Sequence, residues 1–421
     1  MEPLRAVKGM NDVLPDELSR WQHVELAFAR TMRLYGFREV RTPIVEPTSL
    51  FVRAIGEATD VVEKEMYSFV HHDEPLTLRP EGTAGAVRAF IEHKVPQAEP
   101  VTRWYYLGPM FRAERPQRGR YRQFWQAGAE VFGDAGPASD AEMVDLLLRF
   151  LREIGVPDAH VLVNSLGDAA ARVRYKAALV DHLTPKLAGL SPSSQRRLEG
   201  NPLRILDSKD PHDIEAVSDA PSILEVLSPE DTAHFAAFRR HLDALGAPYE
   251  VAPRLVRGLD YYTRTLFEIK GATAKLGAGD TLVGGGRYDG MVGDLGGPSV
   301  PAIGFAAGVE RLVIASELPA SPRVIDAYVA PVGDASTDYA LVLARDLRAS
   351  GVATELDGRQ ASLKAQLRRA SAVGARFALI AGEDEVARGV VQLKDLSAQS
   401  QETVARADVV ATLRRKLEGT S

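Results

Sequence analysis

Two strand-like runs joined by a short polar loop constrain the fold of this chain more than any other feature of its sequence. Residues 103–111 and 123–132 are both rich in aromatic and apolar side chains, and the segment 112–122 between them is polar and contains Pro and Gly. Runs of this kind on either side of a turn-forming segment are typical of paired antiparallel strands. The sequence therefore predicts a long antiparallel hairpin.

The second strand of this hairpin predicts a face that binds a ligand. Because side chains alternate across a strand, every second residue lies on the same face. One face of this strand carries an aromatic ring, an amide, a glycine and a carboxylate, in the order Phe124, Gln126, Gly128 and Glu130. Such groups suit the floor of a polar pocket, and the glycine would let a ligand approach the backbone. By the same alternation, Trp125 would face away from this pocket.

Arginine is concentrated in the loop of the predicted hairpin. Five arginines occur within residues 111–122, although the formal net charge of the chain is −6. The planar and permanently charged arginine fork suits phosphate oxygens. The loop therefore predicts an anionic ligand, either a nucleotide or a nucleic acid, whereas the loop taken alone would also fit an ordinary solvated surface.

The rest of the chain predicts further domains. Its 421 residues are 45% hydrophobic and 26% charged, as in ordinary globular proteins, and the length suggests about two to four domains. Helical patterns replace strand signals between about 168 and 250, so we expect an inserted helical subdomain. Beyond a proline-containing boundary at 318–323, short apolar runs alternate with helical patterns, including a basic one at 359–373, as in a small α/β domain.

Several kinds of structure are excluded or not expected. The chain has no cysteine, which excludes disulfides and thiolate zinc sites and fits a cytoplasmic setting. No apolar run of about 18 residues occurs, so we expect no membrane span, and the N-terminus does not resemble a signal peptide. The nine histidines show no metal-binding pattern, and we expect no structural metal.

Three segments resemble the motifs of class II aminoacyl-tRNA synthetases. Arg112-Ala113-Glu114, followed by an aromatic residue where the second strand begins, resembles motif 2. Residues 301–312, read as a glycine-bearing strand followed by a helix with an arginine at its start, resemble motif 3. Residues 36–43 resemble motif 1, the element that forms the dimer interface in that class. The resemblance therefore implies a homodimer.

Four further segments narrow the resemblance to the histidyl-tRNA synthetases of bacterial type, which belong to class IIa. Residues 79–83 resemble the amino-acid-binding loop of that family, 257–263 and 284–289 resemble its two histidine-specific signatures, and 201–209 resembles part of its insertion. The motifs His-x-Gly-His and Gly-x-x-x-x-Gly-Lys-Ser/Thr do not occur, which excludes class I synthetases and P-loop enzymes.

The resemblance implies a fold and an activity. The fold class would be α/β (α+β): a class II catalytic domain over 1–320, with an antiparallel sheet and a helical insertion at about 168–250, and an α/β anticodon-binding domain over 325–421. The activity would be that of a histidine–tRNA ligase, which activates L-histidine with ATP and transfers it to tRNA(His). Magnesium would arrive with ATP, no membrane would be involved, and the enzyme would be cytoplasmic.

The resemblance also implies roles for individual residues. The two catalytic residues would stabilise charge on the α-phosphate of ATP: Arg112 and Arg257. ATP would be bound by Arg112, Glu114, Phe124 and Arg311. Histidine would be bound by Glu81, Thr83, Gln126, Glu130, Tyr261 and Tyr262, with Glu130 and Tyr262 on the two imidazole nitrogens. The tRNA would be bound by Arg115, Gln117 and Arg122.

Two other functions compete with this interpretation. The first is a non-catalytic regulatory paralogue that partners an ATP phosphoribosyltransferase in histidine biosynthesis. The second is an RNA-binding or kinase-associated module with a degenerate synthetase fold. Such paralogues typically lose motif arginines, whereas this chain has Arg112, Arg257 and Arg311. We therefore favour the enzyme.

Overall fold

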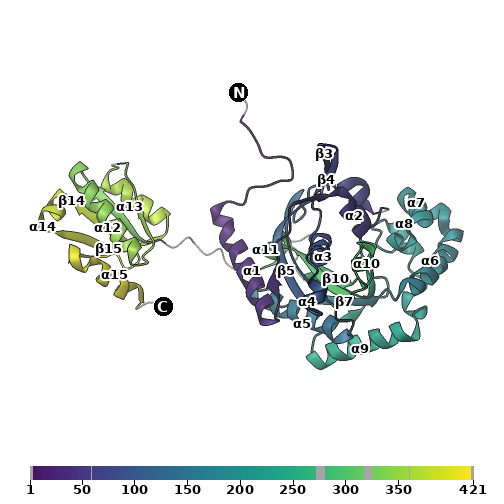
Figure 1. Cartoon of the computed structure of the whole chain (residues 1–421). Helices are drawn as coiled ribbons and strands as arrows, with labels where there is room; N and C mark the ends of the chain where they lie inside the picture. The colour runs from purple at the N-terminus through teal and green to yellow at the C-terminus, as the bar shows by residue number, and fades with distance from the viewer. Residues whose placement is uncertain (1–2, 58, 272–279, 317–324, 360, 419–421) are drawn as a thin grey trace. The chain divides into compact units, whose positions relative to one another are not determined.

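The structure is a computed structural model of the chain, and it describes residues 3–57, 59–271, 280–316, 325–359 and 361–418 (Figure 1). The chain divides into two compact units, Met1–Val13 with Arg20–Leu318, and Leu14–Ser19 with Pro319–Ser421. The boundary that the sequence predicts near 318–323 lies outside the described residues. No helix among the described residues is long and apolar enough to cross a membrane.

An eight-stranded sheet forms the centre of the first unit. Its strands are, in spatial order, β1 (Arg38–Glu39), β5 (Thr102–Phe111), β6 (Gln123–Phe132), β11 (Ala302–Gly308), β10 (Thr281–Arg287), β9 (Thr263–Gly271), β7 (Ala159–Ser165) and β8 (Glu250–Val251). The six inner strands pair antiparallel, and the short edge strands β1 and β8 pair parallel to their neighbours. The predicted hairpin is confirmed as β5 and β6.

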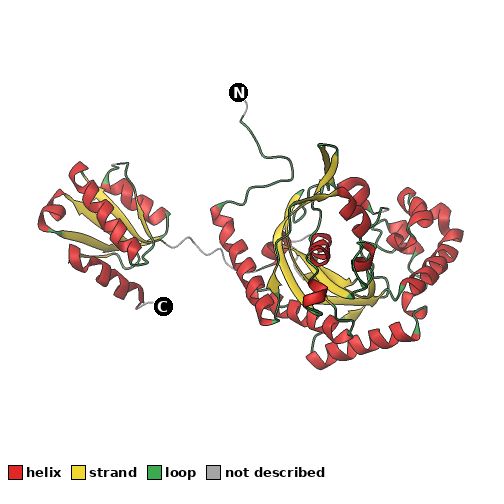
Figure 2. Cartoon of the chain, viewed as in Figure 1, coloured by secondary structure: helices red, strands yellow, loops and turns green. Residues whose placement is uncertain are grey.

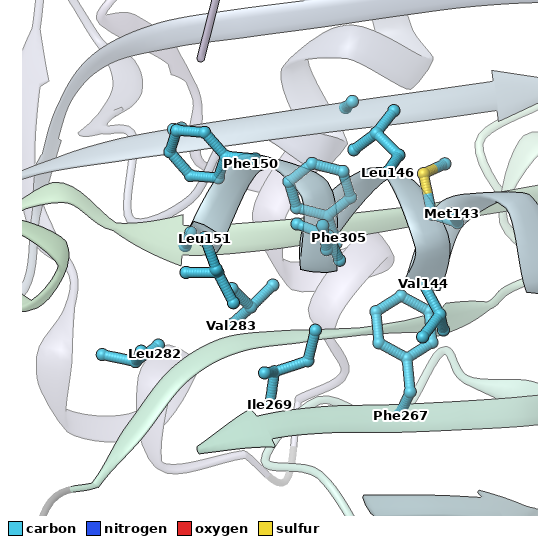
Figure 3. Packing of buried hydrophobic residues seen from close by; sticks show 14 of the residues in the cluster. Met143, Val144, Leu146, Phe150, Leu151, Phe267, Ile269, Leu282, Val283 and Phe305 are labelled. Atoms are coloured by element: carbon cyan, nitrogen blue, oxygen red, sulfur yellow. The ribbon is translucent and has the colours of Figure 1, made fainter. Parts of the chain in front are cut away.

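Three helices cover one face of this sheet: α1 (Pro15–Leu34), α5 (Pro137–Glu153) and α9 (Pro229–Leu245). The ring of Phe28 in α1 lies 5.4 Å from that of Phe150 in α5 and 6.3 Å from that of Phe305 in β11. Figure 3 shows Phe150 and Leu151 among side chains of β9, β10 and β11. Full burial of one such side chain stabilises the fold by about 1.5–3 kcal/mol. Trp125 also packs here, as its place in the strand predicts.

Short elements close one end of the opposite face. They are a three-stranded antiparallel sheet with the order β2 (Val45–Pro47), β4 (Glu74–Leu78) and β3 (Tyr67–His71), and the helices α2 (Thr48–Ile55), η1 (Val61–Glu65), α3 (Thr83–Glu92), α4 (Val95–Ala98) and α10 (Met291–Asp294). Phe132 and Ala302, at one end of β6 and β11, are buried against residues of α2, α3 and α10. The middle of this face remains for the residues described in the next section.

The predicted insertion is helical, as Figure 2 shows. Its elements before α9 are α6 (Ala169–Leu183), η2 (Thr184–Gly189), α7 (Pro192–Gly200), η3 (Pro202–Ile205), α8 (Pro211–Ala216) and η4 (Ile223–Glu225). Side chains cap the amino ends of several helices by accepting a backbone hydrogen bond, as Asp168 does for α6, Ser191 for α7 and Ser228 for α9. Such caps satisfy backbone N–H groups that a helix leaves free.

The second unit is the expected α/β domain. A five-stranded sheet has the order β13 (Thr354–Leu356), β12 (Ile325–Val332), β14 (Ala375–Gly382), β15 (Val390–Asp395) and β16 (Ser400–Ala405). Its helices are η6 (Asp334–Ser336), α12 (Thr337–Ala349), α13 (Leu363–Ala372), α14 (Glu383–Arg388), η7 (Arg406–Asp408) and α15 (Val409–Glu418). The basic helix predicted over 359–373 is shorter, because Ser362 accepts a hydrogen bond from Ala365 N–H and caps α13 there.

Candidate active site

Glycines line the uncovered face of the eight-stranded sheet. Residues that pair directly in antiparallel strands lie on the same face, so the register identifies the members of this face. Gln126 pairs with Gly308, Gly128 with Ala306, and Glu130 with Gly304. The glycines on this face are Gly108, Gly128, Gly284, Gly286, Gly304 and Gly308. The predicted binding face of β6 is therefore continued by glycine-rich neighbours.

Large side chains lie on most of these glycines. A carbon atom added at Gly128 would collide with Tyr106, one at Gly284 with Arg257, and one at Gly304 with Glu130. A glycine allows another group to approach the backbone in this way. Gly308 differs, because an added carbon there would meet no atom within 4 Å. The described chain thus leaves bare backbone at the end of β11, between the predicted ATP-binding residues of β6 and α11 (Val309–Ala315).

Glu130 lies at the buried end of this face. Its side chain is fully buried, and one carboxylate oxygen accepts a hydrogen bond from the Tyr106 hydroxyl at 3.1 Å, while the other accepts one from Tyr288. Burial raises the pKa of Glu130 to about 8. The rings of Tyr261 and Tyr262 are 4.5 Å apart, and Tyr261 lies 5.6 Å from Tyr288. A carboxyl group among tyrosines can bind a neutral or cationic nitrogen base.

The amino end of α3 brings together the other residues predicted to bind histidine. The Glu81 carboxylate accepts hydrogen bonds from the N–H groups of Thr83 and Ala84, both at 2.8 Å. Gln126 Oε1 accepts one from Gly82 N–H at 3.0 Å. Glu81, Thr83 and Gln126 are all buried, and burial raises the pKa of Glu81. This end of the helix thus places one carboxylate and one amide next to Tyr106.

A chain of contacts joins Arg257 to Arg311. Arg257 donates a hydrogen bond to Glu268 at 3.0 Å, and the same carboxylate accepts one from the Thr281 hydroxyl at 2.9 Å. Arg311 then donates to the Thr281 carbonyl at 2.7 Å and to the carbonyl of Gly119, in the hairpin loop, at 3.1 Å. The two arginines, one from a loop and one from helix α11, are therefore linked through Glu268 and Thr281 on the adjacent strands β9 and β10.

The electrostatics of these arginines favour an anion. Burial, followed by the charge of Arg120, lowers the pKa of Arg311, and the charge of Arg257 acts in the same direction. Cations that repel one another in a partly buried place are stabilised by a negative ligand. Among the described residues, Arg311 donates its hydrogen bonds to two carbonyl groups.

Arg112 lies at the start of the hairpin loop. Its guanidinium donates a hydrogen bond to the Pro80 carbonyl at 2.8 Å and lies 5.5 Å from the centre of the Phe124 ring. Glu114 is 3.9 Å from Arg112 and 3.4 Å from Arg120. Arg112 is therefore placed between the loop that carries Glu81 and the aromatic ring of β6.

The residues predicted to bind tRNA divide into two groups. Arg115 and Gln117 are exposed in the loop. Arg122 is instead half-buried, and its guanidinium donates to the carbonyl groups of Glu114 and Lys8 at 3.2 and 3.3 Å. The structure thus gives Arg122 a role in holding the N-terminal segment against the loop.

Sequence reasoning missed two residues of the site, Tyr106 and Tyr288, which both contact Glu130. Tyr106 pairs with Gly128 across the predicted hairpin, so hairpin register was the signal that could have found it. Tyr288 follows β10 and was included only as part of a family signature. No group of three or more metal-binding side chains occurs among the described residues.

Comparison with known proteins places the chain in a family. A model of the family described as histidyl-tRNA synthetase matches residues 9–312, and one described as anticodon binding domain matches 326–416. The histidine–tRNA ligase of Sorangium cellulosum is 60% identical over 401 residues, which cover 95% of this chain and 94% of that protein. The histidine–tRNA ligase of Geobacter metallireducens is 48% identical and covers 95% and 97%.

A solved structure agrees with these relatives. Apo histidyl-tRNA synthetase of S. aureus matches with a TM-score of 0.81 and 35% identity over 98% of this chain and all of that one. The fold expected from the sequence is confirmed: a class II catalytic domain built on an antiparallel sheet, followed by a C-terminal α/β anticodon-binding domain. Since the family match covers most of the chain and the relatives extend over nearly all of it, the chain belongs to the histidyl-tRNA synthetase family.

Proposed function

We propose that the protein is a histidine–tRNA ligase, which joins L-histidine to AMP using ATP and then transfers the histidyl group to tRNA(His). The observation that carries the proposal is that one side of the sheet has three arginines, Arg112, Arg257 and Arg311, together with bare backbone at Gly308 and a buried carboxyl group at Glu130. This arrangement offers a place for a triphosphate and a place for an imidazole on one face of a sheet.

In the first step, a histidine carboxylate oxygen bonds to the α-phosphorus of ATP and pyrophosphate leaves. Such a step depends on positioning and charge stabilisation more than on covalent help from the protein. Arg112 and Arg257 would meet the charge that develops on the α-phosphate. Arg311 and Phe124 would hold the adenine between them, over Gly308, where the backbone carries no side chain.

Histidine recognition would use both ends of the amino acid. Glu81, Thr83 and Gln126 would bind the α-ammonium and carboxylate groups, and Glu130, Tyr261 and Tyr262 would bind the imidazole. A buried site that pairs both ring nitrogens leaves polar groups unpaired when another amino acid enters. Such sites can discriminate by about 10⁴–10⁵ without an editing step.

Magnesium would enter as part of the ATP substrate. The carboxylates of Glu65 and Glu114 fit a cation there, because burial and then the charge of Glu114 raise the pKa of Glu65. A cation bound to the phosphates would relieve this repulsion between carboxylates, which supply the oxygen ligands that magnesium prefers.

In the second step, a terminal ribose hydroxyl of tRNA attacks the activated carbonyl and AMP leaves. Arg115 and Gln117 are exposed and available to the acceptor end, whereas Arg122 would act by shaping the loop. The family match over 326–416 supports an anticodon contact by the second domain. Phosphate contacts of this kind make tRNA affinity strongly salt-dependent. The setting would be the cytoplasm.

A second copy of the chain would complete the enzyme. Four apolar side chains are exposed on β2, β3 and the residue before β2: Ile44, Val45, Phe69 and Val70. A nearby hollow of about 350 Å³ is lined in part by Val40, Pro43, Ala89, Val95 and Trp104. Exposed apolar surface of this kind commonly marks an interface. Sedimentation of the wild-type protein and of Val70→Glu tests the homodimer. We expect the wild-type protein to sediment as a dimer and the variant to shift to monomer.

Histidine-dependent exchange of labelled pyrophosphate into ATP tests the proposed activity. We expect exchange with histidine and at least a thousandfold less with the other amino acids, in line with the discrimination expected for a doubly paired side chain. Aminoacylation of a tRNA(His) transcript should follow. Equal exchange without histidine, or none at all, would contradict the proposal.

The regulatory paralogue is less well supported. By the resemblance, such chains lack an anticodon-binding domain and lose motif arginines, and this chain has both the domain match and the arginines. The exchange assay separates the two, since a non-catalytic protein would bind histidine without exchange.

A further inference from the structure

The segment that carries Arg257 and Tyr262 has no regular structure of its own. Residues 252–262 connect β8 to β9 and form no helix or strand. Asp260 N–H donates a hydrogen bond to the Ile55 carbonyl at the end of α2, at 3.3 Å. Two residues proposed to contact ligand thus depend on contacts from other parts of the molecule for their position.

The helical insertion supplies several of these contacts. The side-chain amide of Asn201 donates to both carboxylate oxygens of Asp260, at 2.9 and 3.3 Å. Arg172 of α6 donates to the Tyr262 carbonyl at 3.1 Å. The segment is therefore held at two points by side chains from a subdomain that supplies none of the proposed catalytic residues.

Arg204 makes a third contact between the insertion and this segment. It lies so close to Gly258 that a carbon added at the glycine would be 3.0 Å from Arg204 Nη1. Arg204 Nη2 lies 3.5 Å from Asp60 Oδ2, and Arg197 of α7 donates to the same oxygen at 3.3 Å. Arg204 thus touches both the segment 252–262 and the residue before η1.

The contact at Asp60 continues to the hairpin loop. Asp60 immediately precedes η1, and Glu65, at the other end of η1, accepts a hydrogen bond through its carbonyl from Ala113 N–H at 2.7 Å. Ala113 follows Arg112. The insertion is therefore connected through short contacts to the backbone on which both Arg257 and Arg112 depend.

Apolar packing accompanies the polar contacts. Tyr175, Leu179, Leu203 and Ile223 of the insertion form one buried cluster with Val256 and Tyr262. Among the described residues, however, Asn201 Oδ1 and Arg204 Nη1 are buried without a hydrogen-bond partner. Unpaired buried polar atoms destabilise a fold, so these two atoms oppose the stability that the packing supplies.

We propose that Asn201 and Arg204 are positioning residues of the synthetase reaction, which hold the segment 257–262 so that Arg257 and Tyr262 meet the substrates. The inference rests on the proposed function, and it assigns the insertion a task in the first chemical step, before tRNA takes part. Small errors in the position of a catalytic group are costly: a misplacement of about 1 Å can reduce a rate about a hundredfold.

Exchanging the two partners tests the central contact. Asn201→Asp would face the Asp260 carboxylate with a second carboxylate, and Asp260→Asn would recreate an amide–carboxylate pair in the opposite sense. We expect Asn201→Asp to reduce kcat for histidine-dependent pyrophosphate exchange about tenfold to a hundredfold and to raise KM for histidine. The double variant Asn201→Asp with Asp260→Asn should recover to within about threefold of wild type.

Arg204→Ala and Arg204→Lys test the second positioning residue by the same exchange assay. Arg204→Lys should retain more activity than Arg204→Ala, because lysine keeps a positive charge near Asp60. Arg196→Ala is the matched control, since Arg196 is an exposed arginine of the same insertion helix as Arg197. It should exchange as wild type does. Thermal unfolding of every variant shows whether the protein remains folded.

The outcomes separate this inference from the proposed function. If the wild-type protein lacks histidine-dependent exchange, the proposed function fails. If the wild type shows pyrophosphate exchange and Asn201→Asp matches it in kcat and KM, the positioning role is wrong while the proposed function stands. The same conclusion follows if folded Asn201→Asp is impaired and the double variant recovers no activity.

Discussion

The two faces of the eight-stranded sheet differ in what their side chains do, although the same strands form both faces. On the face covered by α1, α5 and α9, side chains such as Phe267, Val283 and Phe305 are buried against one another. On the other face, glycine occupies the corresponding places in β6, β10 and β11, and long polar side chains lie above it. The first face fills space, and the second leaves space for side chains and substrates.

The charged groups of the two faces differ in the same way. On the packed face, the fully buried Arg287 is bonded to Asp140, which also accepts a hydrogen bond from His234 at 2.9 Å. Although burial opposes its charge, these partners lower the pKa of Asp140. On the glycine face, burial raises the pKa of Glu130 and lowers that of Arg311. The charges of Arg287 and Asp140 on the packed face are paired with each other, whereas burial opposes the charges of Glu130 and Arg311 on the glycine face.

The largest effect expected from this comparison is on stability. Arg287→Met would leave Asp140 buried without its main partner and lower the free energy of unfolding by about 3–5 kcal/mol, as broken buried pairs do. Urea unfolding of the full chain measures it. Adding Asp140→Leu should recover part of the loss, and Arg152→Met, at an exposed position of α5, should change stability by less than about 0.5 kcal/mol. A loss below about 1 kcal/mol for Arg287→Met would show that the ion pair of the packed face does not stabilise the fold as this comparison requires.

Arg257→Ala should have the next largest effect, and this effect should be on catalysis. Removal of one group that stabilises transition-state charge reduces kcat about 10²–10³-fold. Steady-state pyrophosphate exchange measures the loss, with Arg254→Ala, an exposed arginine three residues earlier, as the control. Unchanged exchange in Arg257→Ala would remove Arg257 from the proposed mechanism.

A smaller effect is expected where the glycine face is bare. Gly308→Ala adds a carbon that meets no atom of the chain, so the free energy of unfolding should stay within about 0.5 kcal/mol of wild type. The same carbon would meet the proposed adenine, and KM for ATP should rise about tenfold, equivalent to about 1.4 kcal/mol. Gly293→Ala, at an exposed glycine of α10 that also has open space, should leave KM unchanged.

The smallest effect is a pH dependence of histidine binding. The pKa of Glu130 is raised to about 8, and that of free imidazole is about 6.5. We expect the complex to hold one proton between the Glu130 carboxyl group and the imidazole. Below pH 6.5 both free groups carry a proton, so binding should release one, and above pH 8 neither does, so binding should take one up. Affinity should be highest near pH 7.3 and about threefold weaker at pH 6.0 and at pH 8.5.

Calorimetric titration in buffers of different ionisation enthalpy measures both the affinity and the protons exchanged. Glu130→Gln should lose the alkaline decline, because the amide does not titrate. A decline that persists unchanged in that variant would assign the proton to another group.

The stability of the empty protein gives an independent check on Glu130. Because its pKa is raised in the folded state, the neutral carboxyl contributes stability that is complete below the ordinary pKa of glutamate, about 4.3. This contribution is lost as the pH rises through about 8. Glu130→Gln should therefore reduce the decline in stability between pH 5 and pH 9.

The sequence predicted those parts of the site that depend on neighbouring residues. Alternation within β6 placed Gln126 and Glu130 on one face, and the turn residues between β5 and β6 indicated the hairpin. The contacts of Arg311 with Gly119 and of Arg257 with Glu268 were not predictable from local pattern, because they depend on the order of strands in the sheet.

Other differences have equally local causes. Strand β10 continues through three glycines to Arg287, although glycine does not favour strands, because β9 and β11 pair with it on both sides. Strand β16 has Val404 as its only buried residue, so no alternation of apolar side chains marks this strand in the sequence. The role of Arg122 depends on carbonyl positions in the loop and in the N-terminal segment, which no periodicity reveals.

The short length of helix α3 has a consequence for the proposed homodimer. Its amino end holds Glu81, and its other end places Arg88, Ala89 and Glu92 on the hollow beside the proposed subunit contact. Ten helical residues extend only about 15 Å. In the proposed homodimer, each histidine-binding site would therefore lie one short helix away from the subunit contact. A shift of α3 in one subunit could then be passed directly to the other subunit.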